Sequence, residues 1–108
     1  MVDVVVVPYA DQDVQDIIDY LQSEAETGVA GRYLDNFEAL LDRLATYPET
    51  GTRRPQLGAK ARIGISHPYI IVYDYVPDQD VVVVLRVLHG HRKITKRLLT
   101  KPRQSYQP

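Results

Sequence analysis

Three apolar-rich runs follow one another closely in the second half of the chain, and they limit the folds open to it. The runs cover residues 61–66, 69–76 and 81–88, separated only by His67-Pro68 and residues 77–80. Links this short join neighbouring antiparallel strands, because a parallel connection needs a crossover of a dozen or more residues. The pattern therefore predicts an antiparallel meander.

The first half of the chain carries one strand pattern and two helical patterns. A valine-rich run at residues 2–7 stops at Pro8 and predicts a first strand with both faces covered. Apolar residues then recur at helical spacing from residue 14 to 25, and again from Tyr33 to Tyr47, before Pro48. Two helices joined by about five residues should form an antiparallel hairpin.

This order predicts an α+β fold of two layers, in which the N-terminal strand and the helical hairpin pack on a small antiparallel sheet. The opposite face of that sheet lacks a helix of similar size, so we expect a partner or substrate there. Residues 91–99 predict a short basic amphipathic C-terminal helix. We expect a single domain over residues 1–100 and a flexible tail over residues 101–108.

Composition excludes several classes of protein. The chain has no cysteine, which excludes disulfides, thiolate metal sites and thiol catalysis. Its longest unbroken apolar run covers residues 81–85, far short of the roughly 20 residues that span a bilayer. The start, MVDVVVV, lacks the basic and long apolar regions of a signal peptide. We therefore expect a cytoplasmic protein with no membrane contact.

The formal net charge of -1 conceals two halves of opposite sign. Residues 1–50 hold eleven acidic and two basic residues, whereas residues 51–108 hold three acidic and eleven basic residues. Such segregation favours a surface that meets a polyanion or an acidic partner. A chance distribution of surface charge is the alternative.

Candidate functional residues gather where the last predicted strand ends. Arginine is unusual within an apolar strand and must reach an edge, a partner or a carboxylate. A basic patch suited to phosphate or carboxylate groups would comprise Arg62, Arg86, His89, His91 and Arg92. Alternatively, Arg86 forms a salt bridge with the acidic helices and the histidines merely finish the strand.

Other parts of the sequence predict less chemistry. The turn-rich segment 49–58 predicts an exposed loop that carries Arg53 and Arg54. The acidic residues of the first helix are typical of a solvated face: Asp11, Asp13, Asp16 and Asp19. The sequence has no complete set of zinc ligands, no G-x-S-x-G motif of serine hydrolases and no glycine-rich phosphate-binding loop. We therefore expect no metal and no cofactor.

From about Asp3 to Leu99 the chain resembles toxins of the RelE/ParE superfamily, found in bacterial type II toxin–antitoxin systems. The segments that carry the resemblance are LLDRLATYPETGTRRPQLG, ARIGISHPYIIVYDY and VLRVLHGHR before a basic tail. The RVLHG-x-R ending is closest to the ParE branch. The resemblance implies a toxin that arrests growth and is neutralised by a cognate antitoxin.

The superfamily divides by mechanism. ParE-like members poison DNA gyrase, whereas RelE-like members cut messenger RNA in the ribosome without a metal. Arg62 matches the second-strand arginine of RelE-like members and Arg92 the arginine after the last strand, and Arg86 and His91 complete the candidate ribonuclease set. The following residues, KITKRLL, offer no tyrosine, and the near-neutral charge does not suit an RNA-rich target.

The resemblance therefore favours gyrase poisoning, with ribosome-dependent cleavage or a non-toxic interaction module as alternatives. The residues expected to contact the target are Arg86, His89, His91 and Arg92. The residues expected to contact an acidic antitoxin are Arg53, Arg54, Arg62, Arg86 and Arg92. The partners implied are thus an antitoxin and gyrase, or the ribosome and messenger RNA instead of gyrase.

Overall fold

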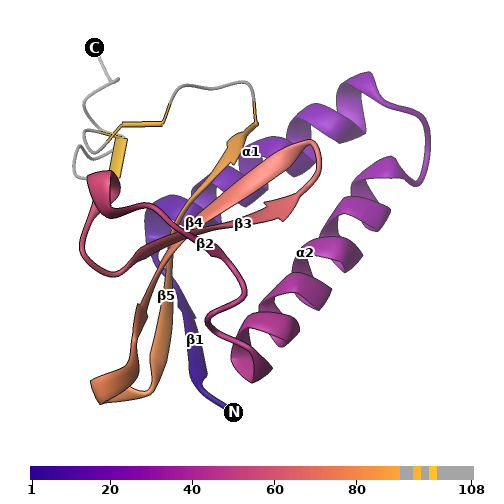
Figure 1. The fold of residues 1–108 in the computed structure, drawn as a ribbon. Helices are drawn as coiled ribbons and strands as arrows, with labels where there is room; N and C mark the ends of the chain where they lie inside the picture. The colour runs from indigo at the N-terminus through magenta and orange to yellow at the C-terminus, as the bar shows by residue number, and fades with distance from the viewer. Residues whose placement is uncertain (91–93, 96–97, 100–108) are drawn as a thin grey trace.

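The computed structural model describes residues 1–90, 94–95 and 98–99 and shows two helices packed on a five-stranded sheet (Figure 1). The predicted two-layer α+β fold is confirmed. In chain order the elements are β1 (Asp3–Val6), α1 (Pro8–Glu24), α2 (Val29–Thr46), β2 (Thr52–Arg53), β3 (Ala61–Ser66), β4 (Tyr69–Val76) and β5 (Val81–His89). Two short 3-10 helices, η1 (Pro55–Leu57) and η2 (Pro77–Gln79), lie between the strands.

The sheet has the strand order β1-β5-β4-β3-β2. Strands β3, β4 and β5 form the predicted antiparallel meander, whereas β1 pairs in parallel with β5, so the sheet is mixed rather than wholly antiparallel. Strand β1 is an edge strand, and Val5 is exposed. The prediction that the first strand is covered on both faces is therefore wrong, because a valine run specifies a strand but not its place in the sheet.

A β-bulge divides β5. Tyr73 pairs with Val84, but its neighbour Val72 pairs with Arg86, so Leu85 has no partner on β4. An extra residue of this kind reverses which face the following side chains occupy. Val84 consequently belongs to the core beneath the helices, whereas Arg86 lies opposite Val72 on the other side of the sheet.

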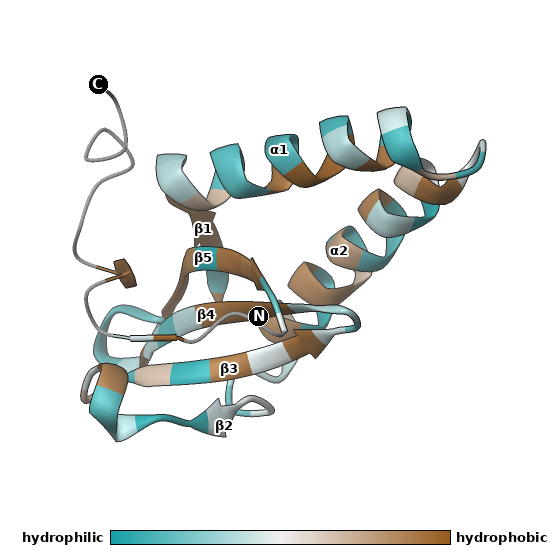
Figure 2. Cartoon of the chain, turned by 90° about the horizontal axis from the view of Figure 1, so that it is seen from above, coloured by the Kyte–Doolittle hydropathy of each residue, from teal (hydrophilic) through white to brown (hydrophobic). Residues whose placement is uncertain are grey.

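The main core lies between the helices and the sheet. Both helices turn an apolar side inward, and α1 keeps its hydrophilic side outward (Figure 2). Helix α1 begins at Pro8, where the fixed φ angle and missing N–H of proline suit a first helical turn. The largest fully buried side chains in this core are those of Leu44, Ile71, Tyr73, Val82 and Val84.

A second apolar cluster covers the opposite face of the sheet. It comprises Leu57, Ala61, Ile63, Ile70, Val72 and Leu88, with Ile94, Leu98 and Leu99 packed against it. The predicted exposed loop at residues 49–58 contains β2 and η1, and Leu57 of η1 is buried in this cluster. This face is consequently less open than the sequence predicted.

Parts of the predictions fall beyond the described residues. The basic helix expected over residues 91–99 has only four described positions, and the tail at residues 101–108 has none. Within the described ranges, no helix is long and apolar enough to cross a membrane.

Candidate functional site

A buried ion pair joins α1 to β5. Arg86 donates from Nε to Asp13 Oδ2 at 2.7 Å and from Nη2 to Asp13 Oδ1 at 2.9 Å, and both side chains are buried. The two parallel hydrogen bonds form a bidentate contact, the strongest geometry for this pair of groups. The alternative in which Arg86 pairs with an acidic helix is therefore the one found. The sequence had placed Asp13 on a solvated face, and for this residue that prediction is wrong.

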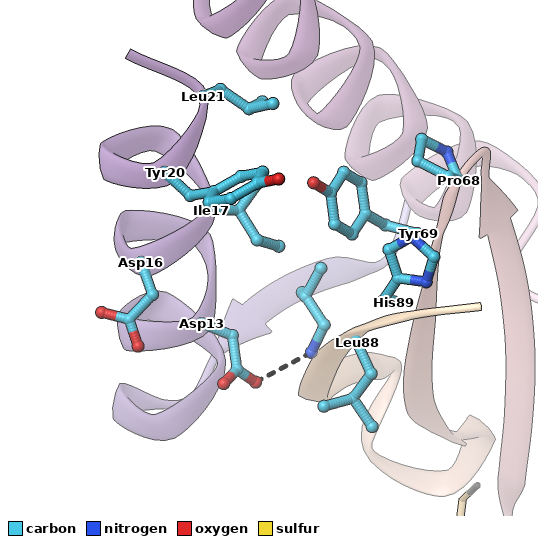
Figure 3. Close-up of a pocket in the computed structure, with 10 residues that line it drawn as sticks. Asp13, Asp16, Ile17, Tyr20, Leu21, Pro68, Tyr69, Leu88 and His89 are labelled. Carbon is cyan, nitrogen blue, oxygen red and sulfur yellow. Dashed lines mark hydrogen bonds between the residues drawn. The ribbon is translucent and has the colours of Figure 1, made fainter. Parts of the chain in front are cut away.

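Asp13 also completes the edge of β5. Strand β1 pairs with β5 only as far as Val84, and beyond it the Val87 N–H donates to Asp13 Oδ2 at 3.0 Å (dashed line in Figure 3). The carboxylate thus takes the place of a neighbouring strand. On its other side, Arg86 Nη1 donates to the Leu98 carbonyl at 2.9 Å. Arg86 therefore connects α1, β5 and the start of the C-terminal segment.

A groove of about 560 Å³ opens between α1, the first residue of β4 and the last residues of β5. Tyr20 of α1 and Tyr69 of β4 point their rings toward one another across it (Figure 3). His89 packs edge-on against Tyr69, with ring centroids 5.6 Å apart. The exposed His89, a predicted target-binding residue, therefore stands at the rim of a largely apolar groove. His91 and Arg92 lie outside the described residues.

Tyr33 of α2 packs behind this groove. Its ring meets that of Tyr69 at a centroid distance of 5.1 Å, and its hydroxyl is buried with no hydrogen-bond partner among the described residues. Burial raises the pKa of Tyr33, and the nearby Tyr69 and Asp13 raise it further. An unpaired buried hydroxyl is unfavourable, because it loses its bonds to water.

Tyr73 and Arg62 hold the turn that follows α2. The Tyr73 hydroxyl donates to the Pro48 carbonyl and accepts from the Gly51 N–H, each at 2.9 Å. Arg62 Nη1 donates to the carbonyls of Glu49 and Gly51 at 3.0 and 2.9 Å. Both side chains consequently satisfy backbone groups of the turn itself, beyond the last residue of the helix.

We expect Tyr33→Phe to raise the free energy of unfolding at neutral pH by about 1–3 kcal/mol, because it removes an unpaired buried hydroxyl. The folded-state pKa of Tyr33 lies above its unfolded value near ~10. The folded state should therefore lose stability as the pH rises above that value, and Tyr33→Phe should lessen this loss. Urea denaturation over a range of pH measures both effects.

The matched control is Tyr73→Phe, which deletes the same oxygen from a tyrosine that is also buried but fully hydrogen-bonded. This change should lower the free energy of unfolding at neutral pH by about 1–3 kcal/mol. Equal losses in the two variants would contradict the assignment of Tyr33 as unpaired.

The predicted basic patch is divided by the sheet. Arg62 pairs with Tyr73 of the helix-side core, whereas Arg86 pairs with Val72 of the opposite cluster. Residues paired across strands share a face, so Arg62 and Arg86 lie on opposite faces. The structure brings together Arg53 and Arg62, which are paired across β2 and β3. Arg54, the next residue, lies beside Gln56.

Apart from His89, sequence reasoning missed the residues that line the groove, and it missed the role of Asp13. One signal could have identified Asp13: it falls on the helical stripe of Ala10, Val14 and Ile17, at the spacing of a core position. A carboxylate on that stripe needs a buried cationic partner. Within the residues described, no three His, Asp or Glu side chains come together in a group that could hold a metal ion.

This fold, a helical hairpin packed on one face of a mixed sheet, is shared with solved chains of bacterial toxin–antitoxin systems. The chain is similar to one in the chromosomal ParDE toxin–antitoxin system of P. aeruginosa (TM-score 0.68, 15% identity, 82% of this chain and 96% of that chain covered). It is also similar to the isolated E. coli RelE toxin (TM-score 0.58, 14% identity, 86% and 88% covered). A chain of the M. tuberculosis RelBE2 toxin–antitoxin complex gives a TM-score of 0.52 at 18% identity, with 82% and 96% covered.

The model of one family matches most of the sequence. Residues 4–94 match the ParE toxin of the type II toxin–antitoxin system parDE. The chain therefore belongs to the ParE toxin family, the branch to which the sequence resemblance had pointed. No curated protein matches the chain.

Proposed function

We propose that this toxin arrests growth by binding and poisoning DNA gyrase, and that a cognate acidic antitoxin neutralises it. The choice of gyrase as the target rests on one observation. Arg62 and Arg86 lie on opposite faces of the sheet, and each makes hydrogen bonds within the fold. Cleavage of RNA needs groups that converge on one phosphate. Arg62 and Arg86 are two of the four candidate ribonuclease residues, and their side chains do not converge on one such position.

Charge supports the same choice. A toxin that enters the ribosome works against a dense field of phosphates, and a strong positive charge favours such binding. The net charge of this chain is -1. Within the proposed gyrase-binding surface, His89 stands exposed at the groove and leads into His91 and Arg92. Arg86 is buried and donates to the Leu98 carbonyl, so we assign it support of this surface from within the fold rather than direct contact with the target.

The antitoxin is proposed on charge and on the neighbouring structures. The ParDE and RelBE2 structures are described as a toxin–antitoxin system and complex. An acidic, partly disordered antitoxin would fold onto Arg53, Arg54 and Arg62, which lie on and beside β2. Arg92, also proposed to contact the antitoxin, lies outside the described residues.

Expression of the chain in a bacterial host, with and without the gene that neighbours its own, tests this function. We expect growth to stop, cells to filament and a DNA-damage response to begin, and the neighbouring gene product to prevent all three. Rapid loss of protein synthesis with cleaved transcripts would instead indicate a ribonuclease. Continued growth despite tight binding of the neighbouring protein would indicate a non-toxic interaction module.

A further inference from the structure

We propose that a small hollow between β2, β3 and the end of β4 binds a carboxylate side chain of an acidic polypeptide partner. The hollow has a volume of about 180 Å³ and is lined by Glu49, Arg53, Ala59, Lys60, Arg62, Tyr75 and Pro77. Three of these residues are basic and one is acidic. The inference rests on the proposed function only for the source of the peptide, which is the antitoxin.

Two arginines meet directly across the strands of this hollow. Arg53 of β2 is paired with Arg62 of β3. The Arg54 N–H donates to the Ala61 carbonyl, so Arg54 and Ala61 form a hydrogen-bonded pair. Hydrogen-bonded and non-hydrogen-bonded pairs alternate along an antiparallel ladder. The adjacent pair, Arg53 and Arg62, is therefore a non-hydrogen-bonded pair, for which the Cα atoms lie about 4.5 Å apart. Like charges directly opposite one another destabilise a sheet. An anion between the two guanidinium groups would remove that repulsion.

The Arg62 guanidinium is already oriented for such an anion. Its Nη1 is held by the Glu49 and Gly51 carbonyls, and the side chain is only 16% exposed. A group fixed in advance loses little conformational entropy when it binds a ligand. The second terminal nitrogen, Nη2, lies 3.7 Å from a Glu49 carboxylate oxygen, which is too long for a hydrogen bond.

Glu49 indicates which anion the hollow favours. Its carboxylate approaches Arg62 from within the chain, yet the side chain is 73% exposed and, among the residues described, makes no other ion pair or hydrogen bond. A partner carboxylate in a hydrogen-bonding position would form a stronger charge-assisted contact. Glu49 thus shows that a carboxylate can lie near Arg62 Nη2, while the hydrogen-bonding position on that nitrogen stays open to a partner's carboxylate.

The remaining cations are available to the same ligand. Among the residues that the structure describes, neither the Arg53 nor the Lys60 side chain makes a hydrogen bond or ion pair. Lys60 acts at a distance on Asp74, whose pKa is raised by burial and lowered by this lysine. Strand β2 is the last in the sheet, so Arg53 can be approached from its outer side.

The small size of the hollow favours a peptide over a nucleic acid. A nucleic-acid backbone carries a charge on every nucleotide and binds along an extended basic track. Here three cations converge on one volume of about 180 Å³ with Glu49 at its margin. One carboxylate fits that arrangement, whereas a run of phosphates would need basic residues along a longer track.

A labelled ten-residue polyglutamate peptide and a single-stranded DNA of ten nucleotides serve as probes for fluorescence anisotropy with the full chain. We expect Arg53→Gln and Lys60→Gln each to weaken peptide binding about tenfold or more, as loss of a charge-assisted contact predicts. The matched control is Arg43→Gln, which removes the same charge from the exposed surface of α2, outside the hollow. It should weaken binding about twofold at most.

Equal weakening by Arg53→Gln and Arg43→Gln would overturn the inference, because only general attraction between charges would remain. Preferential binding of the DNA, lost in Arg53→Gln, would overturn it in favour of a phosphate site. The same variants are then tested with the protein encoded by the neighbouring gene. Arg53-dependent binding by a chain that does not arrest growth would support this site while contradicting the proposed toxicity, so the two claims fail separately.

Discussion

Replacing Asp13 with leucine is expected to lower the free energy of unfolding by about 3–5 kcal/mol, because it leaves a buried charge without its partner. Asp13 holds two nitrogens of Arg86 and the Val87 N–H, and both charged side chains are buried. Without the carboxylate, the guanidinium must either remain unpaired in the interior or pull β5 away from α1. The chain has no tryptophan to report unfolding by fluorescence. Urea denaturation followed by far-ultraviolet circular dichroism therefore measures the loss.

Two further variants show whether the ion pair itself is responsible. Asp13→Leu combined with Arg86→Met should recover most of the loss, because replacing both members by apolar residues removes the buried charge. Asp19→Leu removes an exposed carboxylate from the same helix and should change the free energy of unfolding by about 0.5 kcal/mol or less. A loss below about 1 kcal/mol in Asp13→Leu would mean that the pair is not buried as described.

Truncation of Leu44 to alanine is expected to lower the free energy of unfolding by about 2–5 kcal/mol. Leu44 has no exposed surface and lies in the core between α2 and the sheet. The change removes buried apolar surface and leaves a cavity that the packed strands cannot fully close. The midpoint of urea denaturation should fall without a change of slope.

Leu34 provides the matched control on the same helix. It is 36% exposed, so Leu34→Ala deletes the same atoms but creates no enclosed cavity. We expect this variant to lose about 1 kcal/mol or less. Similar losses at the two positions would contradict the face of α2 that the structure buries.

The fold was largely predictable because it depends on local patterns. The apolar stripes of α1 and α2 have helical spacing, and the links between β3, β4 and β5 are too short for anything but antiparallel pairing. The place and direction of β1 were not predictable in this way. Its pairing with β5 joins residues about 80 positions apart, and a valine run can pair in either direction.

The candidate site was less predictable because of one bulge. Simple alternation along β5 would place Arg86 on the same face as Val82 and Val84. The unpaired Leu85 reverses that alternation, so Arg86 leaves the helix-side face and is separated from Arg62. Nothing in the sequence marks this bulge, and the predicted basic patch depended on its absence. The partner of Arg86, by contrast, could have been sought among carboxylates on the apolar stripe of α1.

Incubation of the purified chain with gyrase, ATP and supercoiled plasmid tests the proposed target most directly. After detergent and protease treatment, we expect linear DNA that appears only when gyrase and this chain are both present and that disappears when the neighbouring gene product is added. A folded preparation that arrests growth in cells but leaves the plasmid intact would contradict gyrase poisoning. His91 and Arg92 would then be the first residues to test for cleavage of messenger RNA.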